Sequence, residues 1–427
     1  MGRRILVLTE AMMPYCNDWG SCQRVYNYSK EFLRSGHQVD IICKNFSSIE
    51  DRTSIIDGIT VVTPDDAITI KTNAERNIKD SVVSFCKQNA LILRSLQWFY
   101  RIMYSEPNLF RGHESKSWAQ ENKLFILNYI KQNQINCVVI SGPPFGLFYL
   151  ASDIKSIGVK LVLDYRDPWN LWYEKFSFSE KYEKKAIELS DLVIASTSSL
   201  SSALKNKYKK RNIYPVLNGY VESSWEKLDI KKHKAQNKLV ISYVGYILIN
   251  NAPAFRNPQV FLRAARKFVK EHDDVEINFV GIGDDIENIE LELTQYINFQ
   301  NRVPVNEALS IVNNSDVVVV IHTAMDSSGN YIVCGKLYDY LKAGKYIISV
   351  GDHAKCNNEL IDKFSAGIHC GNNERAIMEC LNTVYQKWKQ NGLKINIPKE
   401  IREYTREYQN KRFTEYINNI LEETLNG

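Results

Sequence analysis

The chain of 427 residues has no long uninterrupted run of apolar residues. A helix that crosses a bilayer needs about 20 of them in succession, so the sequence predicts no membrane span. The first apolar run ends at Glu10, which is too early for the core of a secretory signal peptide. We therefore expect a cytoplasmic protein.

Closely spaced cysteines are also absent. The nine cysteines are scattered from Cys16 to Cys380, and none forms a Cys-x-x-Cys pair. Structural metal sites and disulfide frameworks need closer, regular spacing. The histidines that could be considered as ligands lack a Cys or His partner at ligand spacing; they are His37, His113, His322 and His353. We therefore predict reduced core thiols, structural histidines and no metal site.

A large excess of charge of one sign is missing too. Lys and Arg number 54, Asp and Glu number 49, and the formal net charge is +5. So small a surplus does not indicate nucleic-acid binding, although it allows weak attraction to anionic membranes or phosphorylated ligands. A solvated surface of mixed charge is the simpler interpretation. Hydrophobic residues make up 44%, enough for buried cores, and the length suggests two domains.

What the chain does contain is a repeated strand–helix–strand pattern. Residues 5–9 form a short apolar run that is typical of a buried parallel strand, and residues 39–43 form the next one. Between them, Val25, Tyr28 and Phe32 recur at helical spacing. Such βαβ units are repeated in α/β proteins, so this pattern predicts that class of fold.

Further apolar runs extend the pattern into two series. The first continues at residues 137–140, 160–163 and 192–195, and the second lies at residues 239–244, 275–280, 317–321, 346–350 and 366–370. Residues 222–238 between them are polar and charged, which is typical of a linker. We therefore expect two doubly wound parallel sheets, in domains 1–225 and 238–399. A helix over residues 400–427 should pack back on the first domain.

Charged and glycine-containing motifs follow several of these strands. Ligands of doubly wound sheets bind beyond the carboxyl ends of the strands. There, Gly20 would let a phosphate approach the backbone, although an ordinary turn explains it equally well. Arg166 and Asp167 follow a buried strand, where charge is costly unless it takes part in function or forms a structural ion pair. Gly281-x-Gly283 lacks the third glycine of a dinucleotide fingerprint, so a tight turn is favoured.

The segment from Gly335 to Lys345 is the richest in candidate residues. Lys336 opens an expected helix, so its charge would add to the positive end of the helix dipole beside a diphosphate. Asp339 lies three residues later and could accept hydrogen bonds from ribose hydroxyls. A surface lysine and a capping aspartate are the alternative. Arg256 could likewise bind a phosphate or be a solvated surface residue.

Taken together, the motifs resemble the family-four type glycosyltransferases, which have the GT-B fold. Those chains usually open with Gly-Gly-x-x-Arg-Val and continue to Arg-Gly-His-x-Val, and here Gly20-Ser-Cys-Gln-Arg24-Val is followed by Ser35-Gly36-His37-Gln-Val. Later landmarks resemble the bacterial polysaccharide branch of that family; they are Ser141-Gly-Pro143-Pro144-Phe145, Asp164-Tyr-Arg166-Asp167-Pro168-Trp169, Asn218-Gly219 and Gly335-Lys336-Leu-Tyr-Asp339-Tyr-Leu. They occur in the expected order and cover nearly the whole chain.

The resemblance implies two Rossmann-like domains, with a UDP- or GDP-sugar donor in the C-terminal one and a glycan or lipid-linked acceptor in the N-terminal one. It implies sugar transfer with retention, without a metal or other cofactor, in surface polysaccharide or glycoconjugate synthesis. Arg166, Asp167 and Lys336 would be catalytic. The donor-binding residues would be Gly20, Gly245, Arg256, Val303, Gly335, Lys336, Tyr338 and Asp339. Of these, Lys336 and Arg256 would hold the diphosphate, Asp339 the ribose, and Val303 the base through its backbone.

The sequence departs from the family pattern at three places. Ser21 replaces the second glycine, Tyr331 and Asp339 replace a usual pair of glutamates, and no histidine stands at the position that contacts the donor sugar. Two alternatives therefore stay open. One is a non-catalytic GT-B subunit that supports a partner enzyme. The other, less favoured, is a sugar-nucleotide epimerase, although that family opens with Gly-Thr-Arg-Pro-Glu and this chain has Thr9-Glu-Ala-Met there.

Residues 91–104 suggest a peripheral contact with a membrane. They are rich in aromatic and aliphatic residues and also contain Arg94 and Arg101. An amphipathic, aromatic and basic helix can lie on a membrane surface, which would suit a lipid-linked acceptor. A buried helix of the first domain is the other interpretation and is slightly favoured. No nucleic-acid partner is expected.

Overall fold

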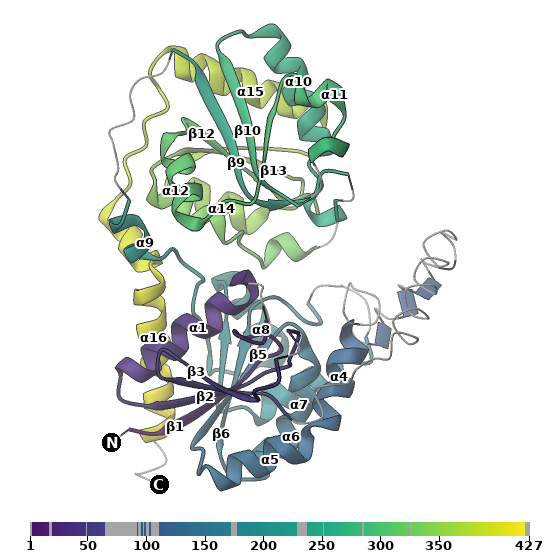
Figure 1. The fold of residues 1–427 in the computed structure, drawn as a ribbon, viewed down its shortest axis with the longest axis vertical. Coiled ribbons are helices and arrows are strands. Elements are labelled where there is room, and N and C mark those ends of the chain that lie inside the picture. The colour runs from purple at the N-terminus through teal and green to yellow at the C-terminus, as the bar shows by residue number, and fades with distance from the viewer. Residues whose placement is uncertain are drawn as a thin grey trace. The chain divides into compact units, whose positions relative to one another are not determined.

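The chain folds into two compact α/β units, shown in Figure 1. The computed structural model describes residues 2–16, 19–47, 49–64, 111–171, 177–228, 237–250, 252–283, 286–324 and 327–422, with scattered positions between 92 and 103. Unit 1 comprises Met1–Leu217 and Asn410–Gly427, and unit 2 comprises Asn218–Gln409. Each is built around a largely parallel sheet, as the sequence predicts.

The sheet of unit 1 has the strand order β3-β4-β2-β1-β5-β6-β7-β8. Its strands are β1 (Arg4–Leu8), β2 (Gln38–Ile42), β3 (Thr53–Ile56), β4 (Ile59–Val62), β5 (Cys137–Gly142), β6 (Lys160–Tyr165), β7 (Leu192–Ala195) and β8 (Ile213–Pro215). Neighbouring strands are parallel except for β3 and β4. The central strands consist mostly of buried Val, Ile and Leu, because a parallel sheet is covered on both faces.

Helices of unit 1 cover this sheet. They are α1 (Trp19–Arg34), α4 (Arg111–Glu121), α5 (Lys123–Gln132), η2 (Phe145–Leu150), α6 (Ala151–Lys155), α7 (Glu180–Leu189), α8 (Ser198–Tyr208) and α16 (Arg406–Glu422). Val25, Tyr28 and Phe32 of α1 are buried, as their spacing predicts. The ring centroid of Phe413 in α16 lies 5.2 Å from that of Tyr28 and 5.3 Å from that of Phe32. The C-terminal helix therefore packs against α1 in the core of unit 1 (Figure 1).

The sheet of unit 2 has the strand order β11-β10-β9-β12-β13-β14, and all its neighbouring pairs are parallel. Its strands are β9 (Leu239–Ile247), β10 (Val275–Ile282), β11 (Asn298–Asn301), β12 (Val317–Ile321), β13 (Tyr346–Val350) and β14 (Gly367–Cys370). The helices are α9 (Glu222–Glu226), η3 (Ala254–Arg256), α10 (Gln259–Glu271), η4 (Ile286–Asn288), α11 (Leu291–Thr294), α12 (Val305–Asn314), η5 (Ser327–Asn330), α13 (Lys336–Lys342), α14 (Lys355–Lys363), α15 (Glu374–Lys389) and η6 (Lys399–Tyr404). Helices α10 and α15 lie side by side on this sheet (Figure 1).

Each sheet has a topological switch point. In unit 1, β1 lies between β2 and β5, and in unit 2, β9 lies between β10 and β12. In sheets of this kind, ligands bind beyond the carboxyl ends of the strands that flank the switch point, which here are β9 and β12 in unit 2 and β1 and β5 in unit 1. These two edges are where each unit is best suited to bind a ligand.

The expected linker over residues 222–238 is not wholly irregular. Its first part forms α9, which belongs to unit 2, so the first unit ends at Leu217 rather than at residue 225. Trp225 is buried, and the carboxylate of Glu222 pairs with Lys342 of α13. One tryptophan and one ion pair anchor this turn to unit 2, which the polar composition of the segment does not reveal.

The expected helix over residues 400–427 is divided. Residues Lys399–Tyr404 form η6 in unit 2, and Thr405 adopts an extended conformation before α16 begins. The backbone around Thr405 pairs with Tyr220, since the Tyr220 N–H donates to the Tyr404 carbonyl over 3.0 Å. Phe413 is buried in unit 1, whereas Tyr404 is buried in unit 2. The single apolar face expected from the sequence therefore belongs to two separate cores.

Among the residues that the structure describes, no helix is long and apolar enough to span a bilayer. The aromatic segment 91–104 lies mostly outside the described residues. Of its described positions, Trp98 is 62% exposed and Phe99 is 51% exposed.

Candidate functional site

The carboxyl edge of the unit 2 sheet holds a buried lysine. Lys336 begins α13, and its Nζ lies 3.5 Å from the ring centroid of Tyr243 in β9. A Cβ on Gly245 would stand 2.7 Å from this Nζ, and Gly245 has a φ of +139°. Glycine at position 245 therefore provides the space that the lysine head occupies. The residue as a whole is half-buried, but Nζ itself is covered and has no hydrogen-bond partner among the described residues.

This environment is unfavourable for an isolated cation. Burial, followed by the positive charge of Arg256, lowers the pKa of Lys336 well below its ordinary value, and Cys334 opposes the shift. A buried polar group without a partner is destabilising unless a ligand supplies one. The electrostatics of the lysine therefore favour an anion at this edge of the sheet.

Arg256 is the second cation of this edge. Its Nη1 lies 3.4 Å from the carbonyl oxygen of Tyr246, and no acidic side chain in the described part of the chain forms an ion pair with it. The end of β12 holds the loop that carries Arg256, because the Thr323 hydroxyl donates to the Ala254 carbonyl over 2.7 Å and accepts from the Asn257 N–H over 2.8 Å. Residues far apart in the sequence thus bring two basic side chains, neither paired with an acidic side chain among the described residues, to the carboxyl ends of β9 and β12.

Two further side chains, His322 and Cys334, belong to this cluster. His322 follows β12 and is 6% exposed, and its Nε2 has no hydrogen-bond partner in the described ranges. Burial would raise the pKa of the Cys334 thiol, but His322, followed by Arg256 and Lys336, lowers it to about 7.

Sequence reasoning placed His322 among the structural histidines and did not single out Cys334. The signal that could have found them is position, because His322 directly follows a buried strand and Cys334 stands two residues before Lys336.

The two glycines of Gly281-x-Gly283 accommodate β9. Gly281 has a φ of +102°, and a Cβ there would stand 2.6 Å from the Gly245 carbonyl oxygen. A Cβ on Gly283 would stand 2.2 Å from the ring of Tyr246. The register of β10 also shifts between Val280 and Ile282. These glycines therefore allow close approach of two strands at a bulge, where a side chain would not fit.

Asp339 contacts a different element from Lys336. Its Oδ1 accepts a hydrogen bond from Nε1 of Trp225 in α9 over 3.1 Å. Burial raises the pKa of Asp339 to about 6, and the Trp225 hydrogen bond and the charge of Arg406 oppose the rise. The carboxyl group is thus held near α9, whereas the ammonium of Lys336 lies against β9.

The remaining residues expected to bind a donor in unit 2 differ in their surroundings. Tyr338 is 1% exposed, and its ring centroid lies 6.2 Å from that of Tyr404, so it packs in the core. Gly335 is exposed, and a Cβ there would meet nothing within 4 Å, so packing does not require glycine. Val303 follows β11, next to Arg302, whose guanidinium lies 4.3 Å from the ring centroid of Tyr246. Val303 and Tyr246 therefore border the same edge of the sheet as Lys336.

In unit 1, the motif that ends β6 contains a buried ion pair. Asp164 is fully buried, and its carboxylate accepts hydrogen bonds from Arg24 over 2.8 Å and from the Ser141 hydroxyl over 2.9 Å. Arg24 also donates to the Val216 carbonyl over 2.9 Å. This pair joins α1 to three strand ends, so the first carboxylate of the motif has a structural role.

Arg166, Asp167 and Gly20 also lie at the carboxyl edge of unit 1. Arg166 donates to the Pro143 carbonyl, and its own carbonyl accepts from the Ser196 hydroxyl over 2.6 Å. Asp167 is half-buried beside it, and Gly20 is exposed in the first turn of α1. The side chain of Trp169 stacks on Phe145 with ring centroids 5.0 Å apart, which fixes the end of this loop.

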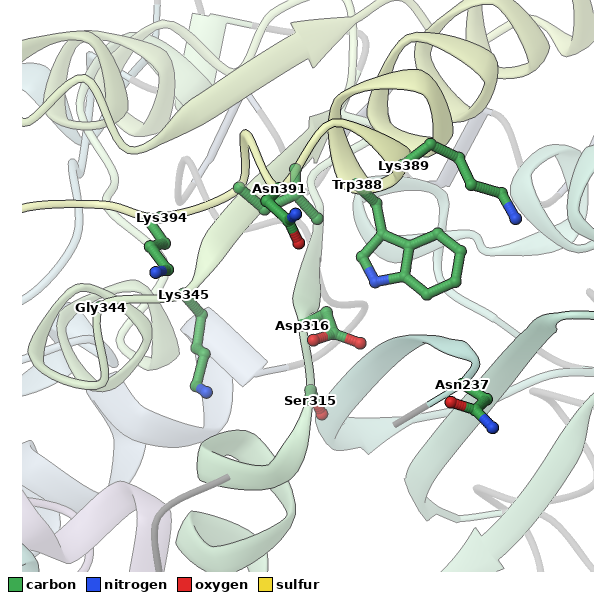
Figure 2. Close-up of a pocket in the computed structure, with 10 residues that line it drawn as sticks. Asn237, Ser315, Asp316, Gly344, Lys345, Trp388, Lys389, Asn391 and Lys394 are labelled. Carbon is green, nitrogen blue, oxygen red and sulfur yellow. The ribbon is translucent and has the colours of Figure 1, made fainter. Parts of the chain in front are cut away.

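A pocket of about 520 Å³ lies elsewhere on unit 2 (Figure 2). It is lined by Asn237, Ser315, Asp316, Gly344, Lys345, Trp388, Lys389, Asn391, Leu393 and Lys394. Asp316 and Lys345 directly precede β12 and β13, so this pocket is at the amino edge of the parallel sheet, opposite the lysine cluster. Within the described ranges, no group of three His, Cys, Asp or Glu side chains could hold a metal ion.

Comparison with known proteins identifies the fold. No protein-family model and no curated protein matches the chain. Sucrose-phosphate synthase from Thermosynechococcus elongatus has a TM-score of 0.63 at 11% identity, over 98% of this chain and 99% of that one. The catalytic domain of starch synthase IV from Arabidopsis thaliana has a TM-score of 0.59 at 11% identity, over 99% and 100%. A putative UDP-N-acetylglucosamine 2-epimerase from Listeria monocytogenes has a TM-score of 0.56 at 11% identity, over 99% and 98%.

These structures belong to transferases and to an epimerase, so the likeness does not separate the two activities. At such low identity it establishes the architecture alone. The chain has the GT-B fold, with two Rossmann-like units.

Proposed function

We propose that this protein is a glycosyltransferase that moves a sugar from a UDP- or GDP-sugar onto a glycan or lipid-linked acceptor. The observation that carries the proposal is the buried Nζ of Lys336, which has no hydrogen-bond partner among the described residues. It lies at the carboxyl edge of the unit 2 sheet, and its pKa is depressed partly by Arg256. A nucleoside diphosphate supplies the negative charge that such a pair of cations would neutralise.

The likeness to solved transferases supports this proposal. The starch synthase structure contains ADP and acarbose, and sucrose-phosphate synthase is another sugar transferase with the same fold. The motif order in this chain resembles that of bacterial polysaccharide enzymes, so the proposed process is surface polysaccharide or glycoconjugate synthesis. A peripheral membrane contact through residues 91–104 would bring a lipid-linked acceptor to the protein.

The proposed reaction retains the configuration of the sugar and uses no metal. Lys336 and Arg256 stabilise the negative charge that develops on the leaving diphosphate, and the diphosphate oxygen accepts the proton of the acceptor hydroxyl. Catalysis of this kind depends on preorganised charge and position. Asp339 binds the ribose, Val303 the base, and Arg166 and Asp167 of unit 1 act on the sugar or acceptor.

Nucleotide binding tests the donor site. Thermal unfolding is measured with UDP, GDP, ADP and CDP in turn. A ligand at about 100 times its Kd stabilises the folded protein by roughly 2.7 kcal/mol, which corresponds to a rise in Tm of roughly 5–10 °C. Lys336→Ala should lose most of that rise. Lys394→Ala removes an exposed lysine at the amino edge and should keep it.

Turnover tests the activity itself. Release of the nucleoside diphosphate from UDP- or GDP-sugars is measured with the same two variants and a mixture of glycan acceptors. Lys336→Ala should reduce turnover by about 100-fold or more. Near-normal turnover in this variant would exclude Lys336 from the reaction. Binding without any turnover would favour a non-catalytic subunit, and conversion of the donor to its 2-epimer would favour an epimerase.

A further inference from the structure

The pocket at the amino edge of the unit 2 sheet has the size of a ligand site. Its volume of about 520 Å³ lies within the range of about 300–1,000 Å³ that is typical of small-molecule sites. At the pocket, Asp316 accepts a hydrogen bond from the Val240 N–H over 2.9 Å, whereas Gly245 of the same strand lies against Lys336. Val240 and Gly245 are five positions apart in β9, which is about 17 Å along the strand. The proposed donor site therefore does not account for this pocket.

Three helices of unit 2 end at the pocket. They are α12, α13 and α15, whose last residues are Asn314, Lys342 and Lys389. Residues 315–316, 344–345 and 391 line the pocket and follow these ends within three positions. The carboxyl end of a helix carries a partial negative charge, in contrast to its amino end. The backbone around this pocket therefore disfavours phosphate groups, which bind at the amino ends of helices.

The lysines of the pocket do not reverse this preference, because two of them already have partners. Nζ of Lys345 donates to a carbonyl of the last turn of α12 over 2.5 Å, as lysines near helix ends often do. Nζ of Lys389 lies 2.5 Å from a carboxylate oxygen of Asp274. The other charged residues of the lining, Asp316 and the exposed Lys394, have opposite signs. The pocket therefore favours an uncharged ligand.

Trp388 forms a flat wall of the pocket. It lies near the end of α15 and is half-buried, so that its indole packs against the core of unit 2 and also lines the pocket (Figure 2). Nε1 of this indole forms no hydrogen bond to the described part of the chain and can donate one to a ligand. The face of an indole carries negative charge and attracts the C–H groups on the face of a sugar ring. Trp388 therefore suits a ligand with an apolar face and hydroxyl groups at its edge.

The polar groups of the pocket match those hydroxyl groups. Asn237 and Asn391 are exposed, and their side-chain amides form no hydrogen bond within the described ranges. Each amide has two donors and one acceptor, and the carboxylate of Asp316 adds further acceptors. A sugar hydroxyl both donates and accepts, so it can bind to either type of group. Small-molecule sites commonly combine apolar walls with a few such polar groups.

We propose that this pocket is a glycan-binding site that holds a sugar unit of a neutral oligosaccharide. Trp388 packs against the face of the sugar ring, and Asn237, Asn391 and Asp316 bind its hydroxyl groups. The binding goes beyond the proposed transfer reaction and does not depend on the donor site. In a transferase, a second site for the glycan would raise the effective concentration of an acceptor or product chain at the protein.

Glycan binding tests this proposal directly. The full-length chain is applied to an array of malto-, cello-, chito- and galacturono-oligosaccharides, and the strongest neutral ligand is then titrated by calorimetry at up to millimolar concentrations. At least one neutral series should bind, and the anionic galacturono-oligosaccharides should bind more weakly. Absence of binding to every neutral series, or a preference for the anionic one, would overturn the proposal.

Variants at Trp388 locate the binding. Trp388→Ala should weaken the affinity about 10-fold or more, because it removes the stacking face, and Trp388→Phe should keep most of it. Trp98→Ala removes an exposed tryptophan of unit 1 and should bind like the unaltered protein. If Trp388→Ala and Trp98→Ala bind the glycan equally well, the glycan does not occupy this pocket and the proposal is wrong.

A second variant covers the case in which Trp388→Ala does not fold. Asn391 has a φ of +54°, which glycine adopts without strain, so Asn391→Gly removes the amide and preserves the backbone. It should weaken glycan binding about 2- to 10-fold, which is the usual effect of one lost hydrogen bond. Unchanged affinity in this variant would contradict the role of the amide.

Nucleotide binding separates this inference from the proposed function. Trp388→Ala should bind UDP as the unaltered protein does, and Lys336→Ala should keep its affinity for the glycan. Loss of UDP binding in Trp388→Ala would show that the pocket takes a nucleotide, and the inference would fail. If no nucleotide binds but the glycan binds in a manner that depends on Trp388, the proposed function fails and this inference stands.

Discussion

The pKa of Lys336 should change when a diphosphate binds, and this makes nucleotide binding dependent on pH. In the free protein, burial and the charge of Arg256 hold this pKa well below its ordinary value. A bound diphosphate would place negative charge beside the ammonium and raise the pKa again. Between the two pKa values, the complex holds a proton that the free protein lacks. Binding should therefore take up a proton on Lys336.

The size of the effect follows from linkage. For one proton taken up, the Kd rises 10-fold for each pH unit above the pKa of Lys336 in the free protein, which is about 1.4 kcal/mol per unit. Below that pKa the lysine is charged in both states, and its contribution to the pH dependence disappears. Affinity should thus be greatest at the lower pH values and fall as the pH rises.

Calorimetry in two buffers with different protonation enthalpies measures the proton directly. The titrations use UDP and GDP between about pH 7.5 and 9.5, because the terminal phosphate, with a pKa of about 6, is then fully ionised. Cys334 and His322 also face the site, so the same titrations are made in Cys334→Ser and His322→Gln backgrounds. Lys336→Arg is the matched control, since a guanidinium keeps its charge over this range.

The lysine protein should take up a proton on binding wherever the pH lies between its two pKa values, and Lys336→Arg should take up none. If the Kd and the proton count of both proteins show the same pH dependence, Lys336 is not the titrating group. The reasoning from its buried position would then be wrong.

Three further predictions concern single positions. Lys336→Met should stabilise the free protein by roughly 1–4 kcal/mol at neutral pH in chemical denaturation. A lysine whose pKa is depressed in the folded state destabilises the fold at every pH below its unfolded pKa of about 10.4, and the effect is complete below the folded pKa. An unchanged or lower stability of the variant would contradict this prediction. Arg24→Met should destabilise unit 1 by about 3–5 kcal/mol, because it leaves the Asp164 carboxylate buried with its cation removed, and Arg24→Met combined with Asp164→Leu should recover much of the loss. Gly245→Ala should weaken UDP or GDP binding by about 10-fold, since the added methyl group displaces the ammonium of Lys336. Gly36→Ala is the control: this glycine also has a positive φ, of +87°, but open space around it, so the variant should lower stability without changing nucleotide affinity.

The architecture could be predicted from the sequence because the parallel strands are nearly continuous apolar runs. Such runs, separated by helical periods, occur in few folds. The limits of the units were harder to predict, because polar composition suggested a linker where Trp225 and Glu222 anchor a short helix to unit 2. The break at Thr405 was also missed. An apolar face at helical spacing does not reveal that its two halves belong to different cores.

The sequence indicates at which edge of the sheet the candidate residues lie, but it does not indicate which of them contact one another. Lys336 was predicted from its position at the start of an expected helix and Arg256 from its position before another, and both lie at the carboxyl edge of unit 2. The contact of Lys336 with Gly245 joins residues about ninety positions apart, and nothing local in the sequence specifies it. His322 was dismissed because metal-ligand spacing was the only test applied to histidines. Its missing hydrogen-bond partner is a property of packing, which a single sequence cannot show.

Asp339 illustrates how a structural contact and a binding role can coexist at one carboxylate. Trp225 takes one acceptor position of Oδ1. An ionised carboxylate has about four such positions, so the hydrogen bond still leaves capacity for two ribose hydroxyls. The family pattern has a glutamate at this position, and the aspartate here is shorter. In this chain, the indole of Trp225 in α9 orients the shorter carboxylate. Its pKa of about 6 also means that the acceptor form is reached only above that pH. Ribose binding through Asp339 should therefore weaken on acidification, opposite in direction to the effect of Lys336, and Trp225→Phe should shift that loss to higher pH because it removes a hydrogen bond that stabilises the ionised form.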